Sequence, residues 1–322
     1  MKFFRFIAVV SALLILSCGL VVGTERPEVT RRHFVYHFDN STYIDFADSV
    51  LNDVRSKLIE LLGDTMSYRP AVYLLDSREA FARVVHGSFP DWGAAAALPE
   101  GGLMAIKNPD HHNIHKPLEM LLKHEYSHLA LADALGDYRA PRWFDEGLAM
   151  LVSMEWGWSD NLAISKAAVF GEFIPLSDIG DVNSFGRSKS HVAYAQSYLA
   201  VFYILEEYGP ESLTIFLDVT ARGGLIDEAL VAATGSNSVG FENEFRQYLG
   251  RRFNALTLFQ DTMYFWLALA LIVIIGAILQ FKRRARYYRR WEEDEKLHST
   301  DFDYGNPDDP EQIDDEDKPW QN

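Results

Sequence analysis

Cysteine is almost absent from this 322-residue chain, which contains a single one, Cys18. A disulfide framework within one chain is therefore excluded, although this alone does not place the protein in the cytosol. Basic stripes are also missing before residue 282, which argues against a nucleic-acid partner. Residues 31–255 lack internal repeats and low-complexity linkers, so we expect them to form one domain.

The N-terminus, MKFFRFIAVVSALLILSCGLVVGTERP, has the layout of a secretory signal peptide. Lys2 and Arg5 supply the positive charge, an apolar stretch runs from Phe6 to about Leu16, and small residues follow. We predict a signal peptide over residues 1–23. An N-terminal membrane anchor is the alternative interpretation of the same pattern.

A second apolar run, TMYFWLALALIVIIGAILQF, covers Thr262 to Phe281 without a charge. A helix of this length spans roughly 30 Å, the thickness of the bilayer hydrocarbon, so we predict a transmembrane helix over 262–281. The six positive charges of Lys282 to Arg290 favour a cytoplasmic location for the residues that follow. Residues 24–261 are then extracytoplasmic, and residues 282–322 form a basic, then acidic, disordered tail.

The outer region has a strand-rich beginning and a helical end, which is typical of an α+β fold. We expect strands at 33–38, 71–75 and 102–106, bounded by turn residues. Apolar periodicity and glycine stops indicate helices at 43–62, 77–85, 116–135, 144–155, 190–208, 211–220, 225–234 and 239–253.

The helix expected at 116–135 contains the sequence HEYSH. His124 and His128 are four residues apart, so both imidazoles lie on one helix face and can bind one ion. Glu125 is rotated by about a hundred degrees and can lie over the open position of that ion. Two zinc ligands and a general base for a metal-bound water have this spacing.

A catalytic zinc site needs a third protein ligand, and Glu146 in the run RWFDEGLA is the candidate. It lies far enough beyond His128 for a turn and a returning helix. Gly147 lets two backbones pack closely beside the metal. The polar residues interrupt an otherwise apolar helix, and a bound cation would satisfy them. We expect one Zn²⁺ per chain, held by His124, His128 and Glu146.

HEYSH followed by RWFDEGLA resembles the gluzincin zinc metallopeptidases, and more narrowly the bacterial peptidase MA-like family. YAQSYLAVFYILEEYG and LIDEALVAATG are similar to later parts of that family, and the resemblance covers about residues 31–255. It implies a zincin-like fold, the three zinc ligands named above, and Glu125 as the general base. It also implies a zinc metalloendopeptidase or an aminopeptidase-like hydrolase.

The resemblance further implies an oxyanion donor from a later helix. Tyr194 is the first choice for this catalytic role, and His191, three residues earlier on the same face, is the second. Asp145 can orient a ligand histidine or cap a helix. The resemblance also implies that the strand at 102–106 presents its edge to an extended peptide. His111, His112 and His115 precede the motif helix, and we leave them outside the site.

The combined signals predict a single-pass protein of the bacterial cell (inner) membrane. Its catalytic domain is periplasmic or extracellular, and its C-terminus is cytoplasmic. The expected partners are a peptide or protein substrate and, through the C-terminal helix, the membrane. A catalytically silent zincin-fold binding module in a membrane-associated assembly is the alternative, and the intact Glu125 argues against it. An intramembrane protease is excluded because the motif helix carries Lys116, Glu119 and Lys123.

Overall fold

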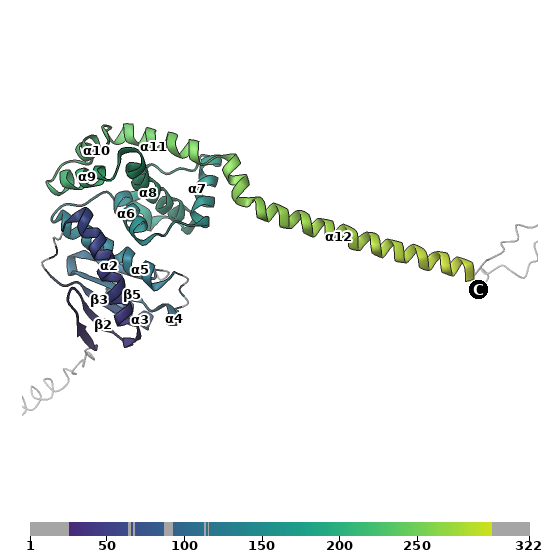
Figure 1. Cartoon of the computed structure of the whole chain (residues 1–322), viewed down its shortest axis with the longest axis horizontal. Coiled ribbons are helices and arrows are strands. Elements are labelled where there is room, and N and C mark those ends of the chain that lie inside the picture. Colours follow the sequence, from purple (N-terminus) through teal and green to yellow (C-terminus); the bar gives the residue numbers. More distant parts are fainter. Residues whose placement is uncertain are drawn as a thin grey trace, which may run out of the picture. The chain divides into compact units, whose positions relative to one another are not determined.

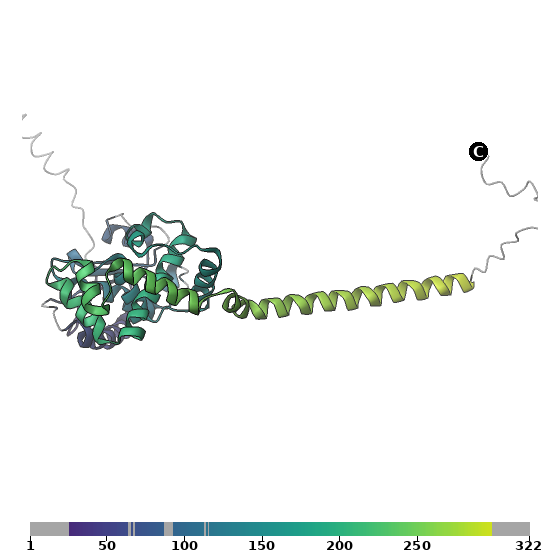
Figure 2. The ribbon, with the colours of Figure 1, turned by 90° about the horizontal axis from the view of Figure 1, so that it is seen from above.

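The computed structural model describes residues 26–297 except 64, 65, 67, 87–92, 113 and 115. Within this part, residues up to Asp261 form one compact unit, and residues from Thr262 onward belong to a second. Figures 1 and 2 show the chain from two directions. The predicted signal peptide, together with residues 298–322, lies outside the described residues.

The first unit begins with a mixed sheet of five described strands in the order β1-β2-β3-β5-β4. The three central strands are parallel: β2 (Val35–Phe38), β3 (Ala71–Leu75) and β5 (Leu103–Lys107). The outer strands β1 (Glu28–Thr30) and β4 (Ala95–Leu98) are antiparallel to their neighbours. The expected small N-terminal mixed sheet is therefore confirmed.

The expectation that the strand at 102–106 presents an edge to an extended peptide is wrong. These residues form β5, which is paired on both sides, with β3 and with β4. The edge belongs to β4, in the run Ala94 to Ala97, and four alanines in a row carry little of the β-branched or aromatic signal that marks a strand. Any peptide that pairs with this side of the sheet must do so at β4.

Helices cover both faces of the sheet. On one face, α2 (Ile44–Leu62) and α5 (Leu118–Leu135) share an apolar core with β2, β3 and β5. The short helix α3 (Arg78–Val84) closes the other face through Phe81. The short elements between them are η1 (Ser41–Tyr43), η2 (Pro99–Gly101) and α4 (Pro109–His112).

The rest of the first unit is helical, as expected, although helices were not predicted at 158–170 or 176–184, and Figure 1 shows the helices gathered beyond α5. The elements are α6 (Arg142–Ser153), α7 (Trp158–Phe170), η3 (Leu176–Ser184), α8 (Arg187–Tyr208), α9 (Glu211–Ala221), α10 (Ile226–Thr234) and α11 (Ser238–Arg252). Leu131 and Leu135 of α5 belong to their core, whereas Leu118 to Ala130 belong to the core of the sheet. Helix α5 is thus buried on several sides, which explains why its apolar residues are not confined to one stripe.

Two helix boundaries set the position of the motif. Helix α5 ends at Gly136, whose φ of +60° is unfavourable for other residues. A short loop to Pro141 follows, and α6 starts at Arg142. Because the loop is short, α6 returns along α5 as an antiparallel neighbour. Their packing brings the two polar stretches of the sequence together.

Helix α12 (Ala255–Leu297) contains the predicted membrane span. Its segment Thr262–Lys296 is the one described helix that is long and apolar enough to cross a bilayer. Residues 282–297, which the sequence analysis placed in a disordered tail, are helical. These residues contain neither glycine nor proline and are rich in Arg, Glu and Lys, which favour helix even when they are fully exposed.

Candidate metal centre

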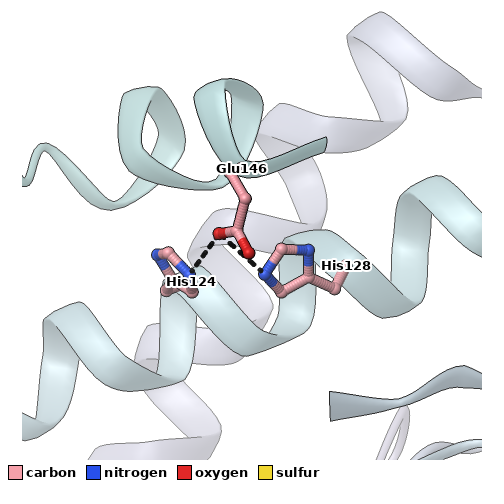
Figure 3. A group of neighbouring side chains, drawn as sticks. All are labelled: His124, His128 and Glu146. Atoms are coloured by element: carbon pink, nitrogen blue, oxygen red, sulfur yellow. Dashed lines mark ion pairs between the residues drawn. The ribbon is translucent and has the colours of Figure 1, made fainter. Parts of the chain in front are cut away.

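The two histidines and Glu146 meet where α5 and α6 pack together (Figure 3). Nε2 of His124 lies 3.5 Å from Oε2 of Glu146, and Nε2 of His128 lies 3.7 Å from the same oxygen. One ligand atom from each residue falls within 4.8 Å of the other two. The group that the sequence singled out is therefore brought together and could hold a metal ion.

The close approach of α6 to α8 depends on Gly147. A Cβ atom at this position would lie 2.2 Å from the backbone oxygen of Ser197 and 2.6 Å from a methyl group of Val201. Only glycine allows the two helices to pack at this separation. The expectation that Gly147 permits close backbone packing beside Glu146 is thus confirmed, and the partner is α8.

The far side of each histidine ring faces a carboxylate. Nδ1 of His128 is 2.6 Å from Oδ1 of Asp145, and Nδ1 of His124 is 2.8 Å from Oε1 of Glu155. A proton held on Nδ1 of His128 leaves its Nε2 with a free lone pair directed toward Glu146. Asp145 therefore selects the tautomer and orientation of His128. Glu155 contacts His124 as an ion pair, since Nδ1 of His124 makes no hydrogen bond with the described residues.

Asp145 had two possible roles in the sequence, and the structure separates them. Pro141 is the residue that caps α6, and Asp145 lies inside the first turn, so the capping role is wrong. The contact with His128 agrees with the other role.

Glu155 was missed by the sequence analysis, because it follows α6 and no fixed spacing links it to His124. Lys116 holds one of its oxygens at 2.6 Å, and Ser153 Oγ donates to the other at 3.0 Å. Residue 154 adopts a left-handed conformation, with φ of 57°, that turns the chain back toward the site after the helix ends. These contacts and the turn fix the position of the Glu155 carboxylate beside His124.

Arg142 was also missed, although it lies one helical turn before Glu146. Its Nη2 is 2.5 Å from Oε1 of Glu146, and its Nη1 is 3.7 Å from Oδ2 of Asp145. Charged residues four apart on a helix are expected to interact, so the spacing alone could have found this pair. Arg142 occupies one oxygen of Glu146 and leaves the other for the centre.

The second carboxylate oxygen of Glu146, Oε2, indicates that a cation fits the centre. Glu146 is 2% exposed, and its Oε2 accepts no hydrogen bond from the part of the chain that the structure describes. A buried carboxylate oxygen without a partner costs free energy, and a cation bound between this oxygen and two imidazole nitrogens removes that cost. Two histidines and one carboxylate are a ligand set that suits zinc and leaves a position open for water.

The electrostatics of the site also favour a cation. Burial opposes charge on His124, but Glu146 and Glu155 outweigh it and raise its pKa to about 10. Burial likewise opposes charge on Glu146, yet His124, His128 and Arg142 lower its pKa to about 2. The carboxylates thus draw positive charge onto the ligand nitrogens. A divalent ion supplies that charge without protons.

Glu125 faces the same centre and is 8% exposed. Burial raises its pKa, and the neighbouring histidines act in the opposite direction. A raised pKa suits a carboxylate that must take up a proton and give it back near neutral pH. Glu125 has the surroundings of a general base.

The two candidates for an oxyanion donor differ in their surroundings. Burial and the charge of Glu146 raise the pKa of the Tyr194 phenol, which therefore keeps its proton, and the Arg142 guanidinium lies beside it. His191 instead directs Nε2 to Asp160 at 2.9 Å. Both line the cleft, but Tyr194 is coupled to the centre through Arg142 and Glu146.

A cleft of about 1000 Å³ opens over the centre. Alanines of β4 line one wall, His124, Glu125 and His128 contribute to the floor, and α8 contributes Tyr194 opposite. The space is large enough for several residues of a peptide. The side chains of His111 and His112, and all of His115, lie outside the described residues.

Comparison with known proteins identifies a family and a relative. The model of the family described as "Peptidase MA superfamily" matches residues 58–251, which include α5, α6 and α8. The "Uncharacterized protein YhcO" of Bacillus subtilis (strain 168) is 23% identical over 154 residues. That match covers 45% of this chain and 44% of YhcO, so the chain spans under half the length of this curated relative.

Proposed function

Since this chain belongs to the Peptidase MA superfamily, we propose that it is a membrane-anchored zinc-dependent peptidase with its active site in the cleft between β4 and α8. The observation that carries this proposal is the convergence of two imidazole nitrogens on a buried carboxylate oxygen that accepts no hydrogen bond from the described residues. Glu125, the proposed general base, lines the same cleft.

His124, His128 and Glu146 would hold the zinc ion, with Asp145 and Glu155 orienting the histidines. When bound, zinc supplies an activated water at neutral pH and polarises the peptide carbonyl. All other steps belong to the side chains of the protein.

Glu125 accepts the proton of the attacking water and then delivers it to the nitrogen of the leaving amine. The Tyr194 hydroxyl donates a hydrogen bond to the oxygen that becomes negative when the water adds to the carbonyl. Arg142 holds the side chains of Tyr194 and Glu146 in position, because its guanidinium lies beside both. The edge of β4 offers backbone groups that can pair with an extended substrate.

The C-terminal segment supports the membrane part of the proposal. The side chains of Thr262–Lys296 are not buried by the protein, so a bilayer is the environment in which this apolar surface leaves water. With the basic run Lys282 to Arg290 on the cytoplasmic side, the metal centre is extracytoplasmic.

The first experiment uses the full-length protein in detergent, loaded with zinc, and a diverse peptide library read by mass spectrometry. The Glu125→Gln variant is the matched control, because it removes the base and keeps the three metal ligands. Cuts made by the parent and absent from the variant support the peptidase. A zinc-bound parent that cuts no peptide speaks for a binding module instead.

A further inference from the structure

The walls of the cleft carry three arginines that form no ion pair with any described residue. Arg78 is the first residue of α3, Arg139 lies in the loop between α5 and α6, and Arg187 is the first residue of α8. All three are exposed and line the cleft. Arg139 donates only to backbone oxygens, and no described carboxylate pairs with any of the three guanidinium groups.

The other cations of the cleft have partners. Lys116 binds Glu155, Arg142 binds Glu146, and Lys107 is 4.6 Å from the ring centre of Phe81. The carboxylates of the walls are engaged in the same way: Asp145 and Glu155 face histidines, and Asp160 accepts from Gly157 N and faces His191. Among the described charged side chains of the walls, the three arginines are therefore those without a partner side chain.

This charge contrasts with the domain around it. Residues 26–261 contain 20 Lys and Arg against 32 Asp and Glu, so the domain as a whole is acidic. Its general surface repels an acidic peptide, whereas the cleft presents free guanidinium groups, which stay charged at any pH near neutral. Attraction at the cleft is consequently local and serves to position a ligand.

The arginines lie at positions that a peptide along β4 would pass. The backbone of Lys107 contacts Ala94 on one side and pairs with Leu75 on the other, because Lys107 N donates to Ala94 O. Arg78 follows closely after Leu75 in the sequence. Arg78 therefore lies near the Ala94 end of β4. A neighbouring depression shares Pro99 and Arg139 with the cleft, which places Arg139 at the other end. Ala94 and Pro99 are about 17 Å apart in an extended strand, the length of about five residues of a bound peptide.

Arg187 approaches from the opposite wall. It precedes Tyr194 by two helical turns on α8, so the two residues lie on one helix face roughly 10 Å apart. His124, Glu125 and His128 line the same cleft, so the metal centre and the three arginines share one space. A peptide centred on the metal would thus meet a cation on either side of the bond to be cut.

We propose that the cleft selects peptide segments with acidic side chains on both sides of the cut bond, and that Arg78, Arg139 and Arg187 bind those side chains. This inference rests on the proposed peptidase function and names the substrate class for the same site. Arginine is suited to the role because its planar group can bind a carboxylate with two parallel hydrogen bonds.

The test compares two peptides that share a neutral core and differ only in the flanks, which are Asp and Glu in one and Asn and Gln in the other. The zinc-loaded full-length protein in detergent should cleave the acidic peptide with the higher kcat/KM. Arg139→Gln and Arg187→Gln should each lower the ratio of acidic to amide kcat/KM by about two- to fivefold, as expected for an exposed ion pair. Salt should lower the same ratio in the parent.

Lys189→Gln is the matched control, because Lys189 is an exposed cation on α8 that does not line the cleft. It should leave the ratio unchanged. Equal cleavage of the two peptides by the parent, or an equal loss on both peptides in the arginine variants, would overturn the inference.

A binding measurement separates this inference from the peptidase proposal. The Glu125→Gln variant should bind the fluorescently labelled acidic peptide more tightly than the amide peptide, as followed by anisotropy. Equal binding of the two speaks against acidic selection whatever the parent cleaves. A parent that cuts neither peptide, beside a variant that still prefers the acidic one, counts against the peptidase function alone.

Discussion

Gly147→Ala should destabilise the protein and weaken the metal centre together. The new Cβ would lie 2.2 Å from the Ser197 backbone oxygen, whereas real Cβ contacts stay beyond 3.0 Å. Helices α6 and α8 must therefore separate by at least about 0.8 Å, because a backbone oxygen cannot turn away as a side chain can. Overpacking of this kind costs about 1–3 kcal/mol, and the backbone contact places Gly147 near the upper end.

The magnitude converts into two measurements. For a domain of this size about 1 kcal/mol shifts Tm by roughly 2–4 °C, so a cost of about 3 kcal/mol lowers Tm by roughly 6–12 °C. Glu146 precedes Gly147 and moves with α6, so the zinc affinity measured by competition with a chromogenic chelator should fall by about tenfold or more.

Gly250→Ala provides the control. Gly250 lies in α11, and a Cβ there has no atom within 4 Å. Alanine favours a helix over glycine by up to about 1 kcal/mol, so this variant should keep or raise Tm. If Gly147→Ala melts with the parent and binds zinc equally well, the close packing of α6 on α8 does not hold Glu146 in place.

Three further outcomes follow from the geometry of the centre. Asp145→Asn and Glu155→Gln should each lower zinc affinity by about ten- to a hundredfold, measured by chelator competition; unchanged affinity in both would remove their role in orienting the histidines. Tyr194→Phe should lower kcat by about a hundredfold with KM and zinc affinity little changed, and an equal kcat would assign the oxyanion to another donor. Chelation of the metal should lower Tm in differential scanning calorimetry, and added zinc should restore it. A Tm that does not change with zinc argues against a metal bound to the native state.

Much of the metal centre could be predicted from the sequence, because helical spacing decides it. The two histidines lie one turn apart, and the return of α6 is enforced by a short loop between Gly136 and Pro141. Glu155 could not be found in this way. Its position depends on the left-handed turn at Met154 and on Lys116, which are features of tertiary structure without a sequence period.

The sheet was predictable at its centre and missed at its edges. The central strands β2, β3 and β5 carry large apolar residues, whereas β4 consists of three alanines and a leucine and β1 has three residues. Edge strands receive their conformation from the neighbour that they pair with, so their own composition says little. The part of α12 beyond residue 281 was missed for a related reason. Its charged residues are compatible with an exposed helix as well as with a disordered tail.

The metal ligands and both carboxylates that orient them are supplied by the segment between Lys116 and Glu155, whereas Tyr194 comes from a later helix. Contacts between residues that are close in sequence form early and quickly during folding, because closing the short loop between them costs little entropy. As the chain emerges from synthesis, α5 and α6 can therefore pair as a helical hairpin before α8 docks against Gly147 and fixes Glu146. In the proposed peptidase, a chain that lacks α8 would carry the whole ligand set, but it would hold zinc more weakly than the complete domain and would lack Tyr194.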